Sequence, residues 1–305
     1  TGMMLLVSAV ELLTIYIALE LTALPTAALA AFIREKKSAE SGIKFLILSA
    51  VSSAVLLYGM VLIYGFTGTT HLSEIGTVIA NHLSTSEQMT DNGILLFSVI
   101  LITAGFGFKI SAVPFQMWAP DVYEGAPTPI TGFLSVASKA AGFAIILRIL
   151  YAVFENEALS SDWASMMAVL SAISMSVGNL IAIKQNNIKR MLAYSTIAQA
   201  GYIMVGLAAM AGNTTLYTSG PVGILVYLAG YTFTNLAAFA VITAVSEDSG
   251  DDSVDSFAGL IKKSPTLAII MTVSMISLIG IPPTIGFMAK IYLFGAAVET
   301  NLTWL

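Results

Sequence analysis

Hydrophobic residues fill long segments of this chain, and short polar segments separate them. A transmembrane helix needs about 20 mainly apolar residues. Eight segments meet that condition, and residues 1–10 have the composition of the end of a ninth. The eight segments are 12–33, 41–66, 94–118, 130–154, 163–184, 190–212, 221–245 and 266–297. The pattern predicts an all-α fold: one polytopic transmembrane helix bundle that forms a single domain over residues 1–305.

Prolines interrupt two of these segments. Pro114 lies inside 94–118, and Pro282 and Pro283 lie inside 266–297. Proline removes a backbone donor and cannot continue an α-helix. Broken hydrophobic segments in the two halves of a transporter indicate internal repeats and an ion site. We therefore predict two broken helices related as inverted repeats. The match is imperfect, because Lys109 precedes its proline whereas Lys290 follows its pair.

Basic residues predict the orientation of the bundle. Counting the helices places three basic loops on one side, and these loops hold nine of the 13 lysines and arginines. Those nine are Arg34, Lys36, Lys37, Lys44, Lys184, Lys189, Arg190, Lys262 and Lys263. The loops on the other side, 67–93, 155–162 and 213–220, hold none. The positive-inside rule makes the basic side cytoplasmic, and the expected location is the cell inner (plasma) membrane. The acidic segment 247–256 is expected to be a solvated loop without a metal.

Composition excludes several kinds of chemistry. The chain is 57% hydrophobic and only 10% charged, against about 25% charged in soluble domains. It has no cysteine, which excludes disulfides and cysteine-ligated metal centres, and its two histidines lie in a polar loop. No nucleotide-binding or nucleophile motif is present. We therefore expect no cofactor and no metal in this chain. The apolar start and the absence of an initial methionine indicate an internal fragment of a longer membrane protein.

Four charged residues fall well inside predicted helices: Glu20, Lys109, Lys139 and Lys290. A lysine at a helix centre costs roughly 2.5–3.5 kcal/mol on insertion scales, and pairing or bound water usually offsets that cost. A buried lysine beside a carboxylate can take up and release a proton as neighbouring charges move. The sequence thus predicts a proton relay, with Glu20 and Lys109 as a switch pair. The alternative is a set of structural ion pairs that hold the helices together.

Other polar residues in the helices have less specific roles. Glu11 and Arg148 lie nearer helix ends, where capping or reaching the membrane surface explains them. A further group could either carry water chains or hydrogen-bond across helices, and both readings stay open. That group is Ser135, Ser138, Tyr194, Ser195, Thr196 and Gln199.

Several motifs carry a resemblance to a known family. They are KISAVPFQMWAPDVYEGAPTPITGFLSVASKAAG at 109–142, LELTALP at 19–25, KQNNIKRMLAYSTIAQAGY at 184–202 and GIPPTIGFMAK at 280–290. The chain resembles the antiporter-like membrane subunits shared by respiratory complex I and Mrp-type cation/proton antiporters. Its motif sequences most resemble those of subunit N of bacterial NADH–quinone oxidoreductase. Members of the family have more helices than this chain, so several are missing at each end.

The resemblance implies roles for individual residues. Glu20 matches the glutamate beside the first lysine, Lys109 and Lys290 match the lysines of the two broken helices, and Lys139 matches the connecting lysine. It implies a proton-translocating subunit of a translocase whose quinone and NADH are used elsewhere in the complex. The implied partners are the other membrane subunits of complex I and the lipid bilayer, with no nucleic acid. Gln116 stands where the motif leads us to expect histidine, which makes proton relay at that position doubtful.

Two other functions remain as alternatives. The first is an Mrp-type cation/proton antiporter subunit without redox coupling. The sequence DVYEGAP at 121–127 argues against this function. The second is a non-pumping structural membrane subunit. The retained lysines and both helix breaks argue against the second, because apolar residues would serve a scaffold at least as well.

Overall fold

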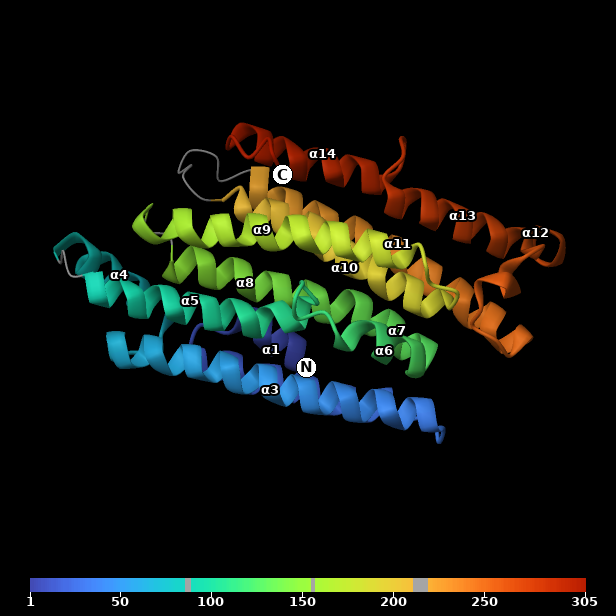
Figure 1. Cartoon of the computed structure of the whole chain (residues 1–305), viewed down its shortest axis with the longest axis horizontal. Helices are drawn as coiled ribbons and strands as arrows, with labels where there is room; N and C mark the ends of the chain where they lie inside the picture. The colour runs from blue at the N-terminus through green and yellow to red at the C-terminus, as the bar shows by residue number, and fades with distance from the viewer. Residues whose placement is uncertain (86–88, 155–156, 211–218) are drawn as a thin grey trace.

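The computed structural model describes residues 1–85, 89–154, 157–210 and 219–305. Nearly all of them are helical, and the helices lie alongside one another in an elongated bundle (Figure 1). The helices are α1 (Gly2–Ser8), α2 (Leu12–Ala30), α3 (Lys36–Thr67), α4 (Leu72–Thr85), α5 (Met89–Ile110), α6 (Trp118–Gly125), α7 (Thr128–Phe133), α8 (Lys139–Val153), α9 (Glu157–Ala182), α10 (Ile188–Ala208), α11 (Ser219–Ser249), α12 (Leu260–Lys263), α13 (Pro265–Ile279) and α14 (Ile285–Glu299). A π-helical turn, η1 (Leu134–Ser138), joins α7 to α8, and a 3₁₀ turn, η2 (Val254–Phe257), precedes α12.

The membrane-spanning pattern matches the prediction from hydropathy. Seven segments of the described chain are long and apolar enough to cross a bilayer. α13 and α14 together form the eighth, interrupted at Gly280. The outer faces of the bundle are apolar, with Ile47, Val51 and Phe233 more than half exposed. Such a surface suits lipid, so the all-α transmembrane bundle is confirmed.

Three helices of the described chain, α4, α6 and α12, lie mainly outside the predicted segments, and α4 is the longest of them. The segment 67–93, read as a polar loop, contains α4. Leu72, Ile75 and Ile79 of α4 are buried, and their spacing of three and four residues is the helical period. That spacing was the available signal. It is easily missed because α4 is too short to cross a membrane and polar residues cover its other face.

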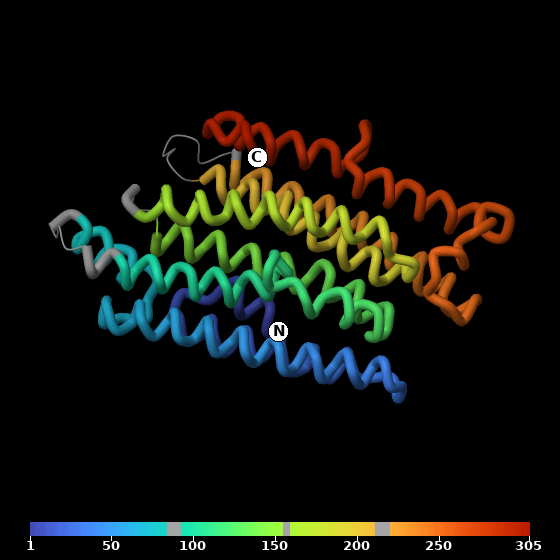
Figure 2. The backbone as a smooth tube through the Cα atoms, in the orientation of Figure 1, coloured from blue at the N-terminus to red at the C-terminus, as the bar shows by residue number. Residues whose placement is uncertain are grey.

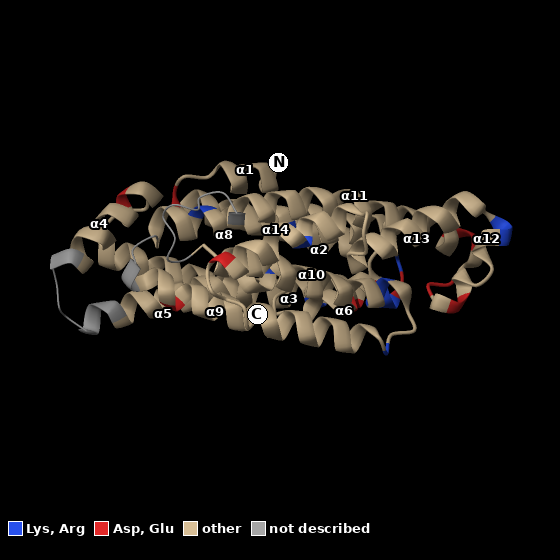
Figure 3. Ribbon diagram, turned by 90° about the horizontal axis from the view of Figure 1, so that it is seen from above, with Lys and Arg blue, Asp and Glu red and all other residues tan. Residues whose placement is uncertain are grey.

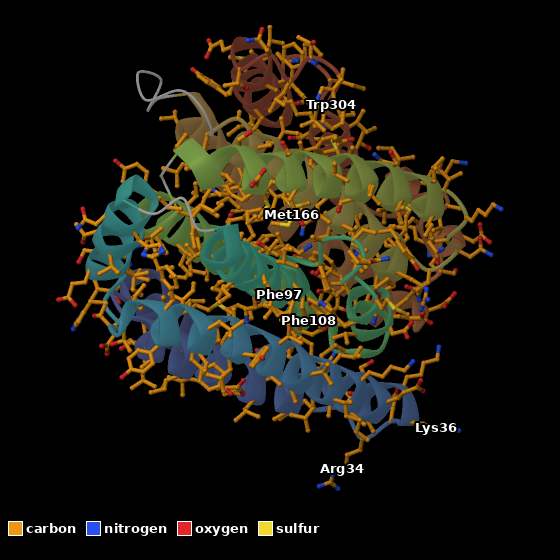
Figure 4. The ribbon with its side chains drawn as sticks, turned by 60° about the vertical axis from the view of Figure 1, so that its left-hand side comes forward. Arg34, Lys36, Phe97, Phe108, Met166 and Trp304 are labelled. Carbon is orange, nitrogen blue, oxygen red and sulfur yellow. The ribbon has the colours of Figure 1, made fainter. Side chains whose placement is uncertain are left out.

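The three basic loops gather at one end of the bundle, which we call the basic end. Figure 3 shows their blue residues together near α6 and α12. Arg34 and Lys36 project away from the helices there (Figure 4). α4 lies at the opposite end (Figure 1). The loops predicted without basic residues include 86–88, 155–156 and 211–218, which lie outside the described residues.

Helix α10 lies at the centre of the bundle, where it packs against α6, α9, α11 and α14. Its contact with α9 is the most extensive between any two helices. Glycines make this approach possible. A Cβ on Gly178 would lie 2.6 Å from the Ala198 nitrogen, and one on Gly201 would lie 2.8 Å from the Met175 nitrogen. Small residues let helices pack closely in a membrane, so most side chains of α10 are buried.

The two broken helices run in opposite directions across the bundle. α5 runs from the end that holds α4 toward the basic end, where α6 follows; α13 starts near α12 at the basic end, and α14 leads away from it (Figure 2). Opposite direction is what inverted repeats require. Hydrophobic core residues from Leu6 to Leu293 form a single cluster, so both broken helices belong to one packed body.

Candidate functional site

The first helix break follows from Pro114 and the residues before it. α5 ends at Ile110, Ser111 takes a positive φ of 60°, and α6 begins only at Trp118. The break frees backbone groups, and side chains satisfy two of them. The Trp118 Nε1 donates to the Phe108 carbonyl at 2.8 Å, and the Val113 nitrogen donates to the Ser174 hydroxyl at 2.9 Å. The predicted interruption is confirmed, with the helix ending before the proline.

Lys109 lies in the last turn of α5 and is 8% exposed. A cation in this position is favoured by the partial negative charge of a helix C-terminus. A cavity of about 30 Å³ lies beside it, lined by Ser49, Ser52 and Ser53 among others. A buried water needs roughly 10–15 Å³ and polar partners. The cavity therefore has the size and the hydroxyl groups to hold one or two waters next to Lys109.

Glu20 and Lys109 are neighbours but not a direct ion pair. The Glu20 carboxylate acts on Lys109 electrostatically. No salt bridge within 4.0 Å joins them in the described structure. The described structure therefore contains no direct ion pair between them, and the switch pair stays a prediction. A proton could pass between them only through an intervening group or water.

Lys139 is the most deeply buried of the three lysines, at 2% exposure. It begins α8 directly after the π-helical turn η1, an irregularity frequent at functional sites. Its Nζ donates to the Thr196 carbonyl of α10 at 3.0 Å. Among the described residues, no carboxylate lies within salt-bridge distance of it. A structural ion pair therefore does not account for this lysine.

Lys290 occupies the second break, and the sequence explains its position. In a continuous helix, the carbonyls of Leu278 and Ile279 would accept hydrogen bonds from the nitrogens four residues later. Those residues are Pro282 and Pro283, which have no N–H. The Lys290 Nζ takes their place, at 3.3 Å from the Leu278 oxygen and 2.8 Å from the Ile279 oxygen.

Two further contacts complete the surroundings of Lys290. Its Nζ lies 4.1 Å above the centre of the Tyr202 ring, a cation–π contact. Gly280 has φ of 89°, and a Cβ there would lie 2.9 Å from the Lys290 Cδ. Only glycine accepts this φ freely, so the lysine side chain lies in space that glycine leaves.

The different order of lysine and proline in the two breaks has a simple geometric outcome. Lys109 belongs to the last turn of α5, and Lys290 reaches back to the last carbonyls of α13. Both cations are thus placed at the C-terminal end of the first half-helix, where helix polarity favours a positive charge. The correspondence is closer than the sequence indicates.

Several polar residues of the central helices hydrogen-bond across helices. The Asn235 Nδ2 donates to the Ser135 hydroxyl at 2.6 Å, and the Tyr231 hydroxyl donates to the Thr196 hydroxyl at 3.2 Å. Gln199 also bonds to a neighbouring helix. Ser135 lies one helical turn before Lys139, and Thr196 is the residue whose carbonyl accepts from Lys139. The cross-helix reading is therefore confirmed for Ser135, Thr196 and Gln199.

Three further polar side chains of the described residues are buried without such partners. The side-chain oxygens of Ser111, Gln116 and Tyr123 are buried without a hydrogen-bond partner. Burial raises the pKa of the Tyr123 phenol well above its ordinary value, so it stays neutral. Arg148 donates to the Val7 carbonyl, and Glu11 accepts from Thr14 at 2.7 Å. The Arg148 bond to the last turn of α1 agrees with the expected capping role, whereas the Glu11 side chain caps no backbone nitrogen of α2.

An ion cluster at the basic end was not predicted from the sequence. Asp121 accepts from the Lys44 Nζ and the Arg190 NH1, both at 2.7 Å. Glu124 accepts from the same guanidinium at 2.9 Å. Burial alone would raise the pKa of Asp121, but the hydrogen bonds from Lys44 and Arg190 more than offset it, and the pKa is lowered. The signal was available, since Asp121 and Glu124 directly follow the predicted span 94–118, whose end lies on the same side as the basic loops.

The prediction of a solvated loop at 247–256 is wrong in part. Asp252 accepts from the buried Lys189 Nζ at 2.7 Å and from Ser246 at 2.6 Å. The Ile188 nitrogen donates to the Asp252 carbonyl at 2.9 Å, and the Val254 nitrogen donates to the Asn186 carbonyl at 2.8 Å. This short antiparallel pairing fastens the acidic loop to the start of α10, because a buried lysine there needs an anion.

Comparison with known proteins places the chain in a family. Residues 9–305 match the family described as NADH:quinone oxidoreductase/Mrp antiporter, TM. The chain belongs to this antiporter-like family. Its relatives include the NADH-quinone oxidoreductase subunit N of Dehalococcoides mccartyi, 48% identical over all of this chain and 62% of the relative. The subunit N of Heliobacterium modesticaldum is also 48% identical, over 99% of this chain and 61% of the relative.

Solved structures of antiporter-like proteins share the fold. A chain of the respiratory complex I from Thermus thermophilus with bound aureothin superposes with a TM-score of 0.78 at 33% identity, over 98% of this chain and 62% of that one. A chain of the Mrp complex from Dietzia gives 0.87 at 23% identity, over 99% of this chain and 54% of the other. The antiporter-like chain described here spans about three-fifths of the curated relatives it matches.

Proposed function

We propose that the full-length protein is the proton-translocating subunit N of a bacterial NADH–quinone oxidoreductase in the plasma membrane. The names of the relatives, which match across the whole chain, support this proposal. The observation that carries the mechanism is Lys139. Lys139 is 2% exposed and, among described residues, its Nζ donates to one carbonyl and pairs with no acid. A buried charge without a counter-ion is costly, and proton transport gives a reason to retain it.

In the proposed mechanism, Lys109, Lys139 and Lys290 carry protons in turn. Glu20 favours the protonated form of Lys109 because the two charges attract. When that carboxylate is neutralised or moves away, Lys109 gives up its proton more readily. Hydroxyl groups near Lys139 and waters in the serine-lined cavity are the groups that could pass it on. The break of α13 then holds the proton on Lys290 until it is released.

The redox chemistry of the proposed complex takes place in other subunits. NADH and quinone would bind there, and this chain contributes the membrane pathway. The partners are then the other membrane subunits and the surrounding lipid. No step of the proposed mechanism needs a cofactor or a metal in this chain. Among the described residues, no cluster of three or more histidines, aspartates and glutamates is arranged to hold a metal ion.

A cation/proton antiporter remains the second candidate, because the matching family includes Mrp antiporters beside NADH:quinone oxidoreductase, and a chain of an Mrp complex also shares the fold. That likeness is below 25% identity and shows the fold alone. The identity of 48% to oxidoreductase subunits weighs more for this chain. A sodium requirement would separate the two. An antiporter would move protons when a sodium gradient is imposed without NADH, whereas the proposed subunit would not.

Replacement of Lys139 by methionine tests the proposal. The full-length subunit would be assembled in its complex and reconstituted into vesicles, and protons moved per electron would be measured. Lys139→Met keeps the volume and removes an unpaired charge, so we expect normal assembly and a lowered ratio. Lys109→Ala and Lys290→Ala should also lower it. Lys262→Ala, an exposed lysine of α12, is the matched control and should change nothing.

The outcomes separate the competing roles. An unchanged proton-to-electron ratio in an assembled Lys139→Met complex would refute the relay. A defect confined to assembly would support the structural role instead. Proton movement that depends on sodium and not on NADH would replace the proposed function with the antiporter.

A further inference from the structure

Gln199 lies between the two lysine sites, on the central helix α10. Thr196, whose carbonyl accepts from Lys139, is three residues earlier. Residues three apart lie on the same face of a helix. The Gln199 Nε2 donates to the Leu278 carbonyl at 3.0 Å. The same oxygen accepts from the Lys290 Nζ at 3.3 Å. One face of α10 thus connects the Lys139 site to the Lys290 site within a single turn.

The amide of Gln199 is held at both ends. Its Oε1 accepts from the Tyr227 hydroxyl of α11, while its Nε2 donates to the broken end of α13. Gln199 is 5% exposed and Tyr227 is 3% exposed. An amide with one donor partner and one acceptor partner has a defined orientation. The NH₂ group therefore points toward the oxygen that Lys290 also uses.

The Leu278 carbonyl can be shared because Pro282 cannot use it. An oxygen with two lone pairs can accept two hydrogen bonds, but each donor withdraws charge from it. Gln199 consequently reduces the hold of this carbonyl on the Lys290 ammonium. An amide does not titrate in the physiological range, so it cannot itself carry the proton.

We propose that Gln199 is a positioning residue for Lys290. The Gln199 amide sets how firmly the Leu278 carbonyl holds the Lys290 proton. This inference rests on the proposed proton transport. Without the amide, the carbonyl serves Lys290 alone, and the protonated state is held to higher pH. With the amide, the broken helix keeps an acceptor that is weak enough to release the proton.

The effect of Gln199 on the Lys290 proton can be measured in the pH profile of pumping, because few other groups near Lys290 titrate in the same range. Among the described residues, the titratable side chain in contact with Lys290 is Tyr202 on α10, and Tyr227 on α11 is linked to the shared Leu278 carbonyl through Gln199. α13 contributes none. Tyrosines ordinarily titrate near pH 10 and stay neutral over the working range. A shift of the pumping profile below pH 9 would thus report on Lys290 or on Lys139. Lys139 contacts the same helix, α10, at Thr196.

The test compares Gln199→Leu with Ser171→Ala in the assembled full-length complex. Ser171 is buried on α9 and donates to the Gly201 carbonyl of α10 at 2.7 Å, so its loss also removes a cross-helix bond but touches no lysine. We expect Gln199→Leu to lower the proton-to-electron ratio. It should also move the midpoint of the pumping pH profile upward by up to about half a unit, because only a competing donor is lost and the Ile279 carbonyl still accepts from Lys290 at 2.8 Å. Ser171→Ala should change neither.

Two more variants keep the inference testable if Gln199→Leu does not assemble. Gln199→Glu retains an acceptor for Tyr227, and its acid form can still donate to Leu278, so pumping should recover at lower pH. Tyr227→Phe releases the amide and should give part of the Gln199→Leu shift. A Gln199→Leu profile that coincides with that of Ser171→Ala would overturn the inference. If Lys139→Met and Lys290→Ala also pump normally, the proposed function itself has failed.

Discussion

Asp121→Asn is the sharpest test of the ion cluster at the basic end. The change keeps the shape of the side chain and removes its charge. Asp121 joins α6 to α3 through Lys44 and to α10 through Arg190, each at 2.7 Å. All three side chains are between 31% and 42% exposed, so water screens both pairs. Each is then worth about 0.5–1 kcal/mol, and the variant should lose about 1–2 kcal/mol.

The loss should depend on pH in a defined direction. The folded-state pKa of Asp121 is below its ordinary value, so the folded state favours the ionised form. Its contribution is present above the unfolded pKa of about 3.9 and is lost as the pH falls toward the lower folded value. Wild type and Asp121→Asn should thus differ by a constant amount from pH 8 to pH 5, and the difference should close below pH 4.

Thermal unfolding of the purified full-length protein in lipid nanodiscs, followed by circular dichroism, measures this difference. Glu40→Gln is the control. Glu40 pairs with the same Lys44 at 2.8 Å, but its side chain is 55% exposed and lies one turn away on the same helix. Its loss should cost only about 0.3–0.5 kcal/mol. Equal losses for the two variants, or an Asp121→Asn difference that grows in acid, would refute the reasoning.

The sequence was sufficient for features that depend on local rules. Hydropathy located the spans because each must fill the thickness of a membrane. Pro114 and the Pro282–Pro283 pair located both breaks because proline withholds an N–H wherever it occurs. The four charged candidates were identifiable because a charge inside an apolar segment is costly in any fold. These inferences need only the chain itself.

Contacts between distant segments were not predictable in the same way. The bond from Lys139 to Thr196 depends on which face of α10 turns toward α8, and small residues on most sides of α10 leave that open. Asp252 was predicted to be solvated because its neighbours are acidic. A backbone pairing with the start of α10 instead brings it to Lys189. The arrangement at Lys290 could have been anticipated, since the prolines identify the two carbonyls left without donors.

Two further substitutions test how the described contacts support Lys189 and Lys290. Asp252→Asn removes the anion 2.7 Å from the buried Lys189 and should cost about 2 kcal/mol in thermal unfolding, less than the 3–5 kcal/mol of a fully buried pair. The exposed neighbour Asp251→Asn should leave thermal unfolding almost unchanged, and similar losses for both would contradict the docked loop. Gly280→Ala places a Cβ 2.9 Å from the Lys290 Cδ at a φ of 89°, so it should both strain the backbone by about 1–2 kcal/mol and displace the ammonium from its two carbonyls. Gly250→Ala imposes the same kind of strain, at a φ of 70° with nothing within 4 Å of the new Cβ. Because only the first substitution reaches Lys290, only Gly280→Ala should lower the proton-to-electron ratio of the reconstituted complex. Equal ratios in the two variants would show that the position of Lys290 at the end of α13 does not matter for transport.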